Sequence, residues 1–180
     1  MVEPFFSFLT NIFNPEDRAN CLLIGGFAVN YYGYTRQTVD VDFLIECSRE
    51  AKFSERLSEQ GYIAIHRDEV FVKYRCWQEG RMDIDFMLVD KTTLDGMLRE
   101  AVSVNYGEVS FLLPSLMHLI ALKLHSIHYN EKIRFYKDMG DIVQLLLRNE
   151  VRVDSEDFRD YCLKYGSEKL YNEILQAVQK

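Results

Sequence analysis

The amino-acid sequence predicts an α+β fold that is followed by an all-helical region. Between residues 20 and 113, short segments alternate apolar and polar residues at the period of two that is typical of strands, with helical segments between them. After Pro114 the apolar residues recur at helical spacing. We therefore predict an α/β core over residues 1–113. We predict a helical region over residues 114–180 that packs on this core, because no Gly/Ser-rich linker separates the two.

The composition is that of a globular protein that carries excess negative charge. Of the 180 residues, 48% are apolar and 27% are charged, and the net charge is −7. Proteins that wrap nucleic acid without sequence preference are usually basic, so the acidic balance argues against that class and leaves room only for a local basic patch. Abundant carboxylates suit a protein that binds divalent cations.

The cysteines and the hydropathy predict a cytoplasmic protein without membrane segments. Cys21, Cys47, Cys76 and Cys162 are scattered and show no zinc-ligand spacing, so we expect four reduced thiols. No basic segment precedes an apolar stretch at the N-terminus, and no apolar run approaches the roughly 18 residues that a membrane span requires.

The first half of the core is predicted as helix, strand, helix and strand. Apolar residues at helical spacing predict a helix over 4–13, which Asn14-Pro15 ends. A short apolar strand over 21–24 leads through Gly25-Gly26 into a helix over 27–32 that stops at Gly33. Strict alternation over 38–46 predicts a strand.

The second half of the core is predicted as a helix followed mainly by strands. A helix over 48–60 has Ser48 as its expected N-cap and Gly61 as its expected C′ residue. The remaining predicted core elements are strands over 62–65, 70–77 and 82–89, a helix over 94–101 and a strand over 108–113. Beyond them we predict helices over 116–129 and 131–148 and two final helices capped by Asp154 and Ser167.

The strand over 38–46 carries the most specific chemical signal, which is Asp40-Val41-Asp42. Residues i and i+2 of a strand project from the same face, so the two carboxylates lie side by side. Such a pair repels unless a cation lies between its members, and Mg²⁺ prefers hard oxygen ligands. The strand over 82–89 supplies Asp83 and Asp85, again on one face, as candidates for a third carboxylate that binds metal or accepts a proton.

A glycine pair precedes the predicted helix over 27–32. Gly25 and Gly26 would let the backbone approach a phosphate closely, and the amides at a helix N-terminus attract anions. The alternative is a plain turn. For Arg36, contact with a phosphate and simple neutralisation of Asp40 remain equally open.

These motifs resemble those of the nucleotidyltransferase superfamily of DNA polymerase beta type. The pattern of its minimal bacterial branch, which includes the AbiEii-type abortive-infection toxins, is Gly-Gly-x-Ala, a downstream Gly, Arg-x-Thr-x-Asp-x-Asp, and a strand with Arg-apolar-Asp. The matching segments here are 25–28, Gly33, 36–42 and 81–83. The resemblance covers about residues 20–148 and implies a nucleotidyltransferase fold, with a mixed sheet flanked by helices and followed by a helical bundle.

The resemblance continues more weakly into the helical region. Such proteins often carry a Lys on one helix and an Arg…Lys-Asp…Asp run on the next, matched here by Lys123 and by Arg134, Lys137, Asp138 and Asp141. Residues 134, 137, 138 and 141 share one helix face. Lys123 or Lys137 is then expected to reach phosphates; the alternative is a solvated face with internal ion pairs.

The resemblance implies a Mg²⁺-dependent enzyme that transfers a nucleoside monophosphate from an NTP, such as ATP, to a hydroxyl. Asp40, Asp42 and Asp83 would be catalytic and bind two Mg²⁺ ions, with Asp85 as an additional candidate ligand. Gly25, Gly26, Arg36, Thr38, Lys123 and Lys137 would bind the nucleotide. The acceptor could be a tRNA end, a protein or a small molecule, and a toxin would have an antitoxin partner. The alternatives are a non-catalytic nucleotide-binding or partner-binding module and, more weakly, a metal-dependent phosphodiesterase or nuclease.

Overall fold

The computed structural model describes residues 2–179 and divides the chain into two compact units. The first unit comprises Met1–Ala28 and Gln37–Ser115, and the second comprises Val29–Arg36 and Leu116–Lys180. The helical unit is therefore not one continuous stretch of sequence, because a short segment from the first half of the chain belongs to it.

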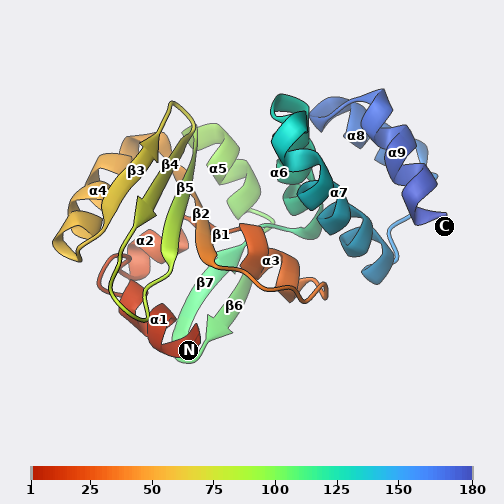
Figure 1. Ribbon diagram of the computed structural model, residues 1–180. Coiled ribbons are helices and arrows are strands. Elements are labelled where there is room, and N and C mark those ends of the chain that lie inside the picture. Colours follow the sequence, from red (N-terminus) through yellow and green to blue (C-terminus); the bar gives the residue numbers. More distant parts are fainter. Residues whose placement is uncertain (1, 180) are drawn as a thin grey trace. The chain divides into compact units, whose positions relative to one another are not determined.

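The first unit is built on a five-stranded mixed sheet with the strand order β1-β2-β5-β4-β3 (Figure 1). Only β2 and β5 are parallel; the other neighbouring pairs are antiparallel. The strands of this sheet are β1 (Leu22–Leu23), β2 (Asp40–Glu46), β3 (Ile63–Arg67), β4 (Phe71–Arg75) and β5 (Asp83–Val89). A second, two-stranded sheet consists of β6 (Val102–Tyr106) and β7 (Val109–Leu113).

The helices of the first unit lie around these sheets. They are α1 (Val2–Leu9), α2 (Pro15–Ala19), α4 (Glu50–Glu59), preceded by the 3₁₀ turn η1 (Cys47–Arg49), and α5 (Lys91–Leu98). Helix α3 (Gly25–Tyr31) begins in this unit and continues into the second.

One face of the five-stranded sheet forms the core of the first unit. Phe43 of β2 and Phe86 of β5 are fully buried there, together with Phe53 of α4 and Phe13, which follows α1. The Phe13 ring lies 4.5 Å from that of Phe43, and the Phe53 ring 5.6 Å from that of Phe86. Because side chains alternate along a strand, the aspartates of β2 and β5 project from the opposite face.

The second unit consists of helices after Pro114. They are α6 (Leu116–Tyr129), α7 (Glu131–Arg148), α8 (Glu156–Tyr165) and α9 (Glu168–Val178). Each of these helices is amphipathic and buries residues such as Leu124, Leu145, Phe158 and Ile174 against its neighbours. The α+β fold with a mixed sheet and a C-terminal group of helices is thus confirmed.

Several element boundaries differ from those predicted, and each difference has a local cause. Asn14-Pro15 not only ends a helix but also begins α2. The Asn14 side chain accepts a hydrogen bond from the Asp17 amide, and the Asp17 carboxylate accepts one from the Asn14 amide, which makes a capping box. Ser48 was wrongly predicted to cap α4, because it lies within η1. Asp90 caps α5 and starts it earlier, and Ser155 rather than Asp154 caps α8. The prediction also missed β6, whereas Ser167 caps α9 as predicted.

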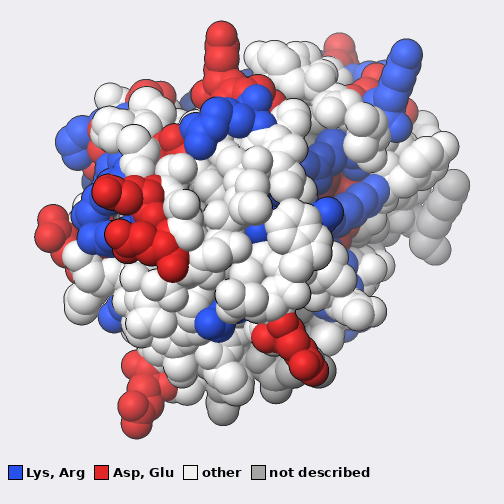
Figure 2. Space-filling model, turned by 60° about the vertical axis from the view of Figure 1, so that its left-hand side comes forward, with Lys and Arg blue, Asp and Glu red and all other residues white. Residues whose placement is uncertain are grey.

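Charged residues are dispersed on the one face of the molecule that Figure 2 shows. On the face seen in Figure 2, Lys and Arg side chains lie in small groups among acidic and uncharged residues, without a continuous basic surface. Among residues 2–179, no helix is both long enough and apolar enough to cross a bilayer.

Candidate metal centre

Three carboxylates converge on the polar face of the five-stranded sheet. Asp40 and Asp42 of β2 and Asp85 of β5 each offer an oxygen, and these oxygens all lie within 4.8 Å of one another. Asp40 and Asp42 are half-buried, whereas Asp85 is only 5% exposed. Three like charges at this separation repel in a partly buried site, and a cation among them would relieve this repulsion.

The parallel pairing of β2 and β5 produces this convergence. Asp40 lies opposite Asp83, and Asp42 lies opposite Asp85, so all four carboxylates project from one face. The Thr38 hydroxyl donates to the Asp40 carboxylate at 3.0 Å and fixes its orientation. The amide of Ile24 donates to the carbonyl of Asp42 at 2.8 Å, which brings the end of β1 and the following glycines next to Asp42.

The two glycines make room for side chains of the site. Gly25 has φ +60, and a Cβ there would lie 1.9 Å from Asp42 Oδ2. A Cβ on Gly26 would lie 2.5 Å from the Thr38 hydroxyl oxygen. Glycine is therefore required at both positions for close approach, and at Gly25 also for its backbone conformation.

We expect Gly25→Ala to lower the free energy of unfolding by about 1–3 kcal/mol, because alanine is strained at positive φ, and also to weaken binding of Mn²⁺ by displacing the Asp42 carboxylate. Gly80→Ala is the matched control, since Gly80 has φ +79 but no heavy atom within 4 Å of an added Cβ. Urea unfolding and calorimetric Mn²⁺ titration of both variants provide the measurement. Equal Mn²⁺ affinity in the two variants would show that the Gly25–Asp42 contact does not matter for the site.

Asp83, which was predicted as the third catalytic carboxylate, lies outside the group of three. Arg75 of β4 makes paired hydrogen bonds to the Asp83 carboxylate, at 3.1 Å from Nε and 2.9 Å from Nη2. Asp85, which was predicted only as an additional ligand, takes the place beside Asp40 and Asp42. Lys73 of β4 donates to Asp85 Oδ2 at 3.1 Å and lies 3.6 Å from Asp83 Oδ2.

The residues present fit a hard divalent cation. Asp85 Oδ1 is buried and has no hydrogen-bond partner among the described residues, although Oδ2 of the same carboxylate is bonded to Lys73. Burial raises the pKa of Asp85, and Lys73 offsets only part of this effect. An unsatisfied buried carboxylate oxygen is costly, and a cation that accepts carboxylate oxygens as ligands would satisfy it. Asp40, Asp42 and Asp85 would hold the metal.

Two of the predicted phosphate ligands, Lys123 and Arg36, belong to an ion-pair network with buried carboxylates. The Lys123 ammonium, 6% exposed as a residue, lies 2.9 Å from Asp138 Oδ1 and 2.6 Å from Asp141 Oδ2. Arg36 donates twice to Asp141, at 2.8 and 3.0 Å. Burial alone would raise the pKa of Asp141, but the charges of Lys123 and Arg36 outweigh burial and lower it. Two cations and two carboxylates balance here, so Lys123 and Arg36 already have ionic partners within this unit.

Lys137 differs from the other members of the predicted helix stripe. It is exposed, whereas Asp138 and Asp141 are buried and bonded to Lys123. The stripe of Arg134, Lys137, Asp138 and Asp141 is therefore neither a uniform solvated face nor a uniform set of phosphate ligands. Its two acids accept hydrogen bonds from Lys123 inside the unit, and Lys137 is exposed to solvent.

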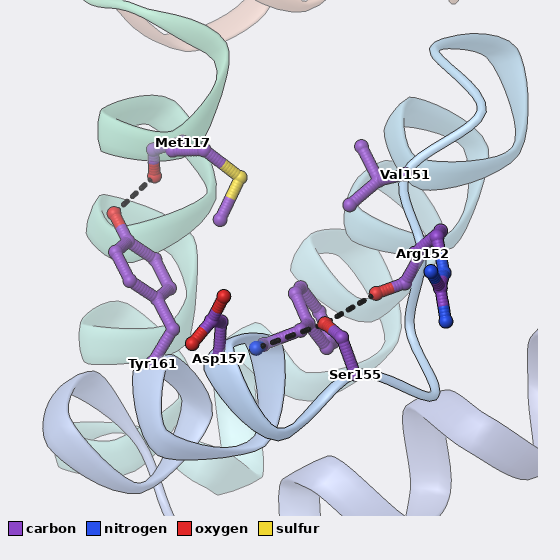
Figure 3. A pocket seen from close by; sticks show the side chains of 7 residues that line it. Met117, Val151, Arg152, Ser155, Asp157 and Tyr161 are labelled. Carbon is purple, nitrogen blue, oxygen red and sulfur yellow. Dashed lines mark hydrogen bonds between the residues drawn. The ribbon is translucent and has the colours of Figure 1, made fainter.

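The helical unit also contains a pocket that none of the predicted site residues lines. Its volume is about 310 Å³, and Figure 3 shows the Tyr161 hydroxyl donating to the Met117 carbonyl, at 2.7 Å, beside it. The lining residues are Met117, Val151, Arg152, Ser155, Asp157, Phe158 and Tyr161. This lining combines apolar side chains with Arg152, Asp157 and Tyr161, none of which is a predicted site residue.

Sequence reasoning overlooked Lys73 and Arg75. The signal was present, because the strand over 70–77 places Lys73 and Arg75 two residues apart and hence on one face, as Asp83 and Asp85 are. What the sequence could not show is that this face adjoins the aspartates, since that depends on the pairing of β4 with β5.

Comparisons with known proteins bear on the family and on the fold. The family model described as "Nucleotidyl transferase AbiEii toxin, Type IV TA system" matches residues 7–179. A search of curated proteins returned no match. The fold is similar to the solution structure of the antibiotic-resistance factor ANT(2'')-Ia, with a TM-score of 0.55 and 12% identity over 99% of this chain and 93% of the other.

Two further structures share the fold at similar distance. An antigenic nucleotidyltransferase-like protein from Paracoccidioides brasiliensis has a TM-score of 0.54 and 13% identity over 99% of this chain and 90% of that one. The crystal structure of ANT(2")-Ia in complex with adenylyl-2"-tobramycin has a TM-score of 0.54 and 12% identity over 97% of each chain. At these identities the likeness concerns the fold alone.

Proposed function

Because the chain belongs to the nucleotidyl transferase AbiEii toxin family, and is thus a nucleotidyltransferase, we propose that it transfers a nucleoside monophosphate from an NTP to a hydroxyl with the help of Mg²⁺ at Asp40, Asp42 and Asp85. The observation that supports the metal site is the convergence of these three carboxylates. In addition, Asp85 Oδ1 is buried and lacks a hydrogen-bond partner among the described residues.

In the proposed reaction the acceptor oxygen forms a bond to the α-phosphorus while the bond from the α-phosphorus to the bridging oxygen breaks. Pyrophosphate leaves, and the hydroxyl proton must be removed. Bound Mg²⁺, one ion or two, would supply positive charge for the phosphoryl oxygens. Asp40 and Asp42 would bind the metal, with Thr38 orienting Asp40. We propose that Asp85, as the third carboxylate, completes the metal site and accepts the hydroxyl proton.

We propose that nucleotide contacts come from Gly25, Gly26 and Thr38 beside the carboxylates; a phosphate contact from the exposed Lys137 stays a prediction from the sequence. The close approach of Gly25 to Asp42 and of Gly26 to Thr38 supports the first three, because it places backbone directly next to the metal ligands. Arg36 and Lys123 are less suited to this role, since their charges are matched by Asp138 and Asp141.

The acceptor and the biological role are further parts of the proposal. The family description supports a toxin of a toxin–antitoxin system, with an antitoxin as its counterpart. An RNA end, a protein hydroxyl and a small molecule are the acceptor classes. The net charge of −7 and the dispersed basic residues of Figure 2 favour an acceptor with a small contact surface over an extended nucleic-acid interface. In one structure of similar fold, adenylyl-2"-tobramycin is the bound molecule, which is a small-molecule product.

We expect one or more NTPs to raise the melting temperature only when Mg²⁺ is present. A ligand at 100 times its Kd adds about 2.7 kcal/mol to the free energy of unfolding, which is roughly 5–10 °C for a chain of this size. Thermal unfolding with each of the four NTPs, with and without Mg²⁺, provides the measurement.

The matched variants for this experiment are Asp40→Asn/Asp42→Asn and Asp95→Asn. The first should lose the Mg²⁺-dependent shift. The second should keep it, because Asp95 lies on α5 in an exposed ion pair with Lys91. A shift that needs no Mg²⁺, or no shift with any NTP, would contradict the proposed function.

A further inference from the structure

Six charged side chains form a ladder across three strands on the polar face of the sheet. Asp40 and Asp42 lie on β2, Asp83 and Asp85 on β5, and Lys73 and Arg75 on β4. Lys73 pairs directly with Asp85 in the antiparallel register of β4 and β5. Directly opposed residues of neighbouring strands have their side chains on the same face, so the cations necessarily border the aspartates.

The two aspartates of β5 are bonded differently by the two cations of β4. Arg75 engages both oxygens of Asp83, so that carboxylate is occupied by a bidentate ion pair. Lys73 makes its hydrogen bond to one oxygen of Asp85 only, at 3.1 Å, and its second ionic contact is with Asp83, at 3.6 Å. Asp85 Oδ1 remains without a hydrogen-bond partner among the described residues and is shielded from water.

The formal charges of the six side chains do not cancel, and an excess of negative charge remains. Four carboxylates are accompanied by two cations, which leaves a net charge of minus two on this face. One divalent cation balances this charge. Lys73 can bind the Asp85 carboxylate before the metal binds, but its single charge does not replace that of a divalent cation.

We propose that Lys73 is a positioning residue of the metal centre, which anchors Asp85 by Oδ2 so that Oδ1 is presented to the metal. This inference rests on the proposed function, because it assumes that Asp40, Asp42 and Asp85 bind a divalent cation. The lysine does not touch the metal or the substrate in this role. It acts through Asp85, as the outer hydrogen-bond partners of metal ligands do.

The test is the affinity for Mn²⁺ alone, measured by calorimetry on the full chain, in Lys73→Met, Lys73→Gln and Lys73→Arg. Loss of such a partner typically weakens metal binding by about 10–100-fold, and we expect this for Lys73→Met. Lys73→Arg, which keeps the charge and a donor, should restore most of the affinity. If Lys73→Met does not fold, Lys73→Gln carries the test, because it retains a donor without the charge; we expect it to bind about tenfold more weakly than wild type.

Lys52→Met is the matched control for a purely structural ion pair. Lys52 lies 2.9 Å from Asp17, a fully buried carboxylate of the same unit that belongs to no metal ligand group in residues 2–179. This variant should bind Mn²⁺ like wild type. Urea unfolding with and without Mn²⁺ gives a second readout: for Lys73→Met the stabilisation by Mn²⁺ should shrink by about 1.4 kcal/mol for each tenfold loss of affinity, whereas a structural role would lower stability equally in both conditions.

Three results would overturn the inference, and they are distinguishable. Unchanged Mn²⁺ affinity in Lys73→Met would show that Lys73 is only a cross-strand ion pair. Tighter binding would show that Lys73 competes with the metal rather than presenting its ligand. Absence of Mn²⁺ binding by the wild-type protein would overturn the metal site itself, and the proposed function with it.

Discussion

Asp42→Asn is expected to reduce nucleotidyl transfer by about 10²–10³-fold, which corresponds to roughly 3–4 kcal/mol of transition-state stabilisation by a metal. The substitution is nearly isosteric, so the close contact with Gly25 is kept while the charge is lost. Asp85→Asn should have a similar effect, because Asp85 is the third member of the carboxylate group. The measurement is transfer of label from an α-phosphate-labelled NTP to acceptors in a desalted cell extract, with pyrophosphate release recorded in parallel.

Asp83→Asn is the informative companion to these variants. Asp83 lies two residues before Asp85 on the same face of β5, but its carboxylate forms an ion pair with Arg75. We expect a loss of activity below about tenfold, in line with a modest ion-pair contribution. If Asp83→Asn abolished transfer while Asp85→Asn were tolerated, the third carboxylate would be Asp83, as the family resemblance of the sequence implies.

Lys123→Met is expected to lower the free energy of unfolding by about 3–5 kcal/mol at pH 7, because it leaves buried carboxylates without their counter-ion. Asp138 and Asp141 are 4% and 2% exposed, and Lys123 contacts both. Arg36 would remain as the partner of Asp141, whereas Asp138 would lose its ammonium partner and keep the hydrogen bond that the Ser126 hydroxyl donates to it. The measurement is urea unfolding followed by circular dichroism, and Lys132→Met on the exposed side of α7 is the control, with an expected change within about 0.5 kcal/mol.

The effect of Lys123→Met should also depend on pH. The pKa of Asp141 is lowered in the folded protein, so its contribution to stability is fully present above the unfolded-state pKa and is lost as the pH falls through the lower folded-state pKa. Lys123 supplies part of this contribution, and wild type loses it on acidification, so the stability deficit of the variant relative to wild type should shrink as the pH falls. A variant that unfolds like wild type yet loses the NTP-dependent thermal shift would instead identify Lys123 as a phosphate ligand.

The pattern of neighbouring residues was sufficient to predict most of the fold and part of the carboxylate group. The alternation over 38–46 identified β2 and placed Asp40 and Asp42 on one face, because a strand has a period of two whatever it pairs with. Helical spacing likewise identified α6 and α7 almost to the residue. The missed helix α2 had a local signal as well, since Asn14 and Asp17 stand at capping-box spacing, but the proline was interpreted only as a breaker.

Only the tertiary structure showed which aspartate of β5 lies with Asp40 and Asp42. Asp83 and Asp85 have the same residue type, the same strand and the same face, so local sequence does not separate them. The register with β2 and the cations of β4 do, because Arg75 occupies Asp83 and Lys73 leaves one oxygen of Asp85 unsatisfied. The partner of Arg36 could not be predicted from local sequence either, since Asp141 lies 105 residues away along the chain. Periodicity is a property of adjacent residues, whereas the pairing of buried charges depends on which distant segments the folded chain brings within a few ångströms of each other.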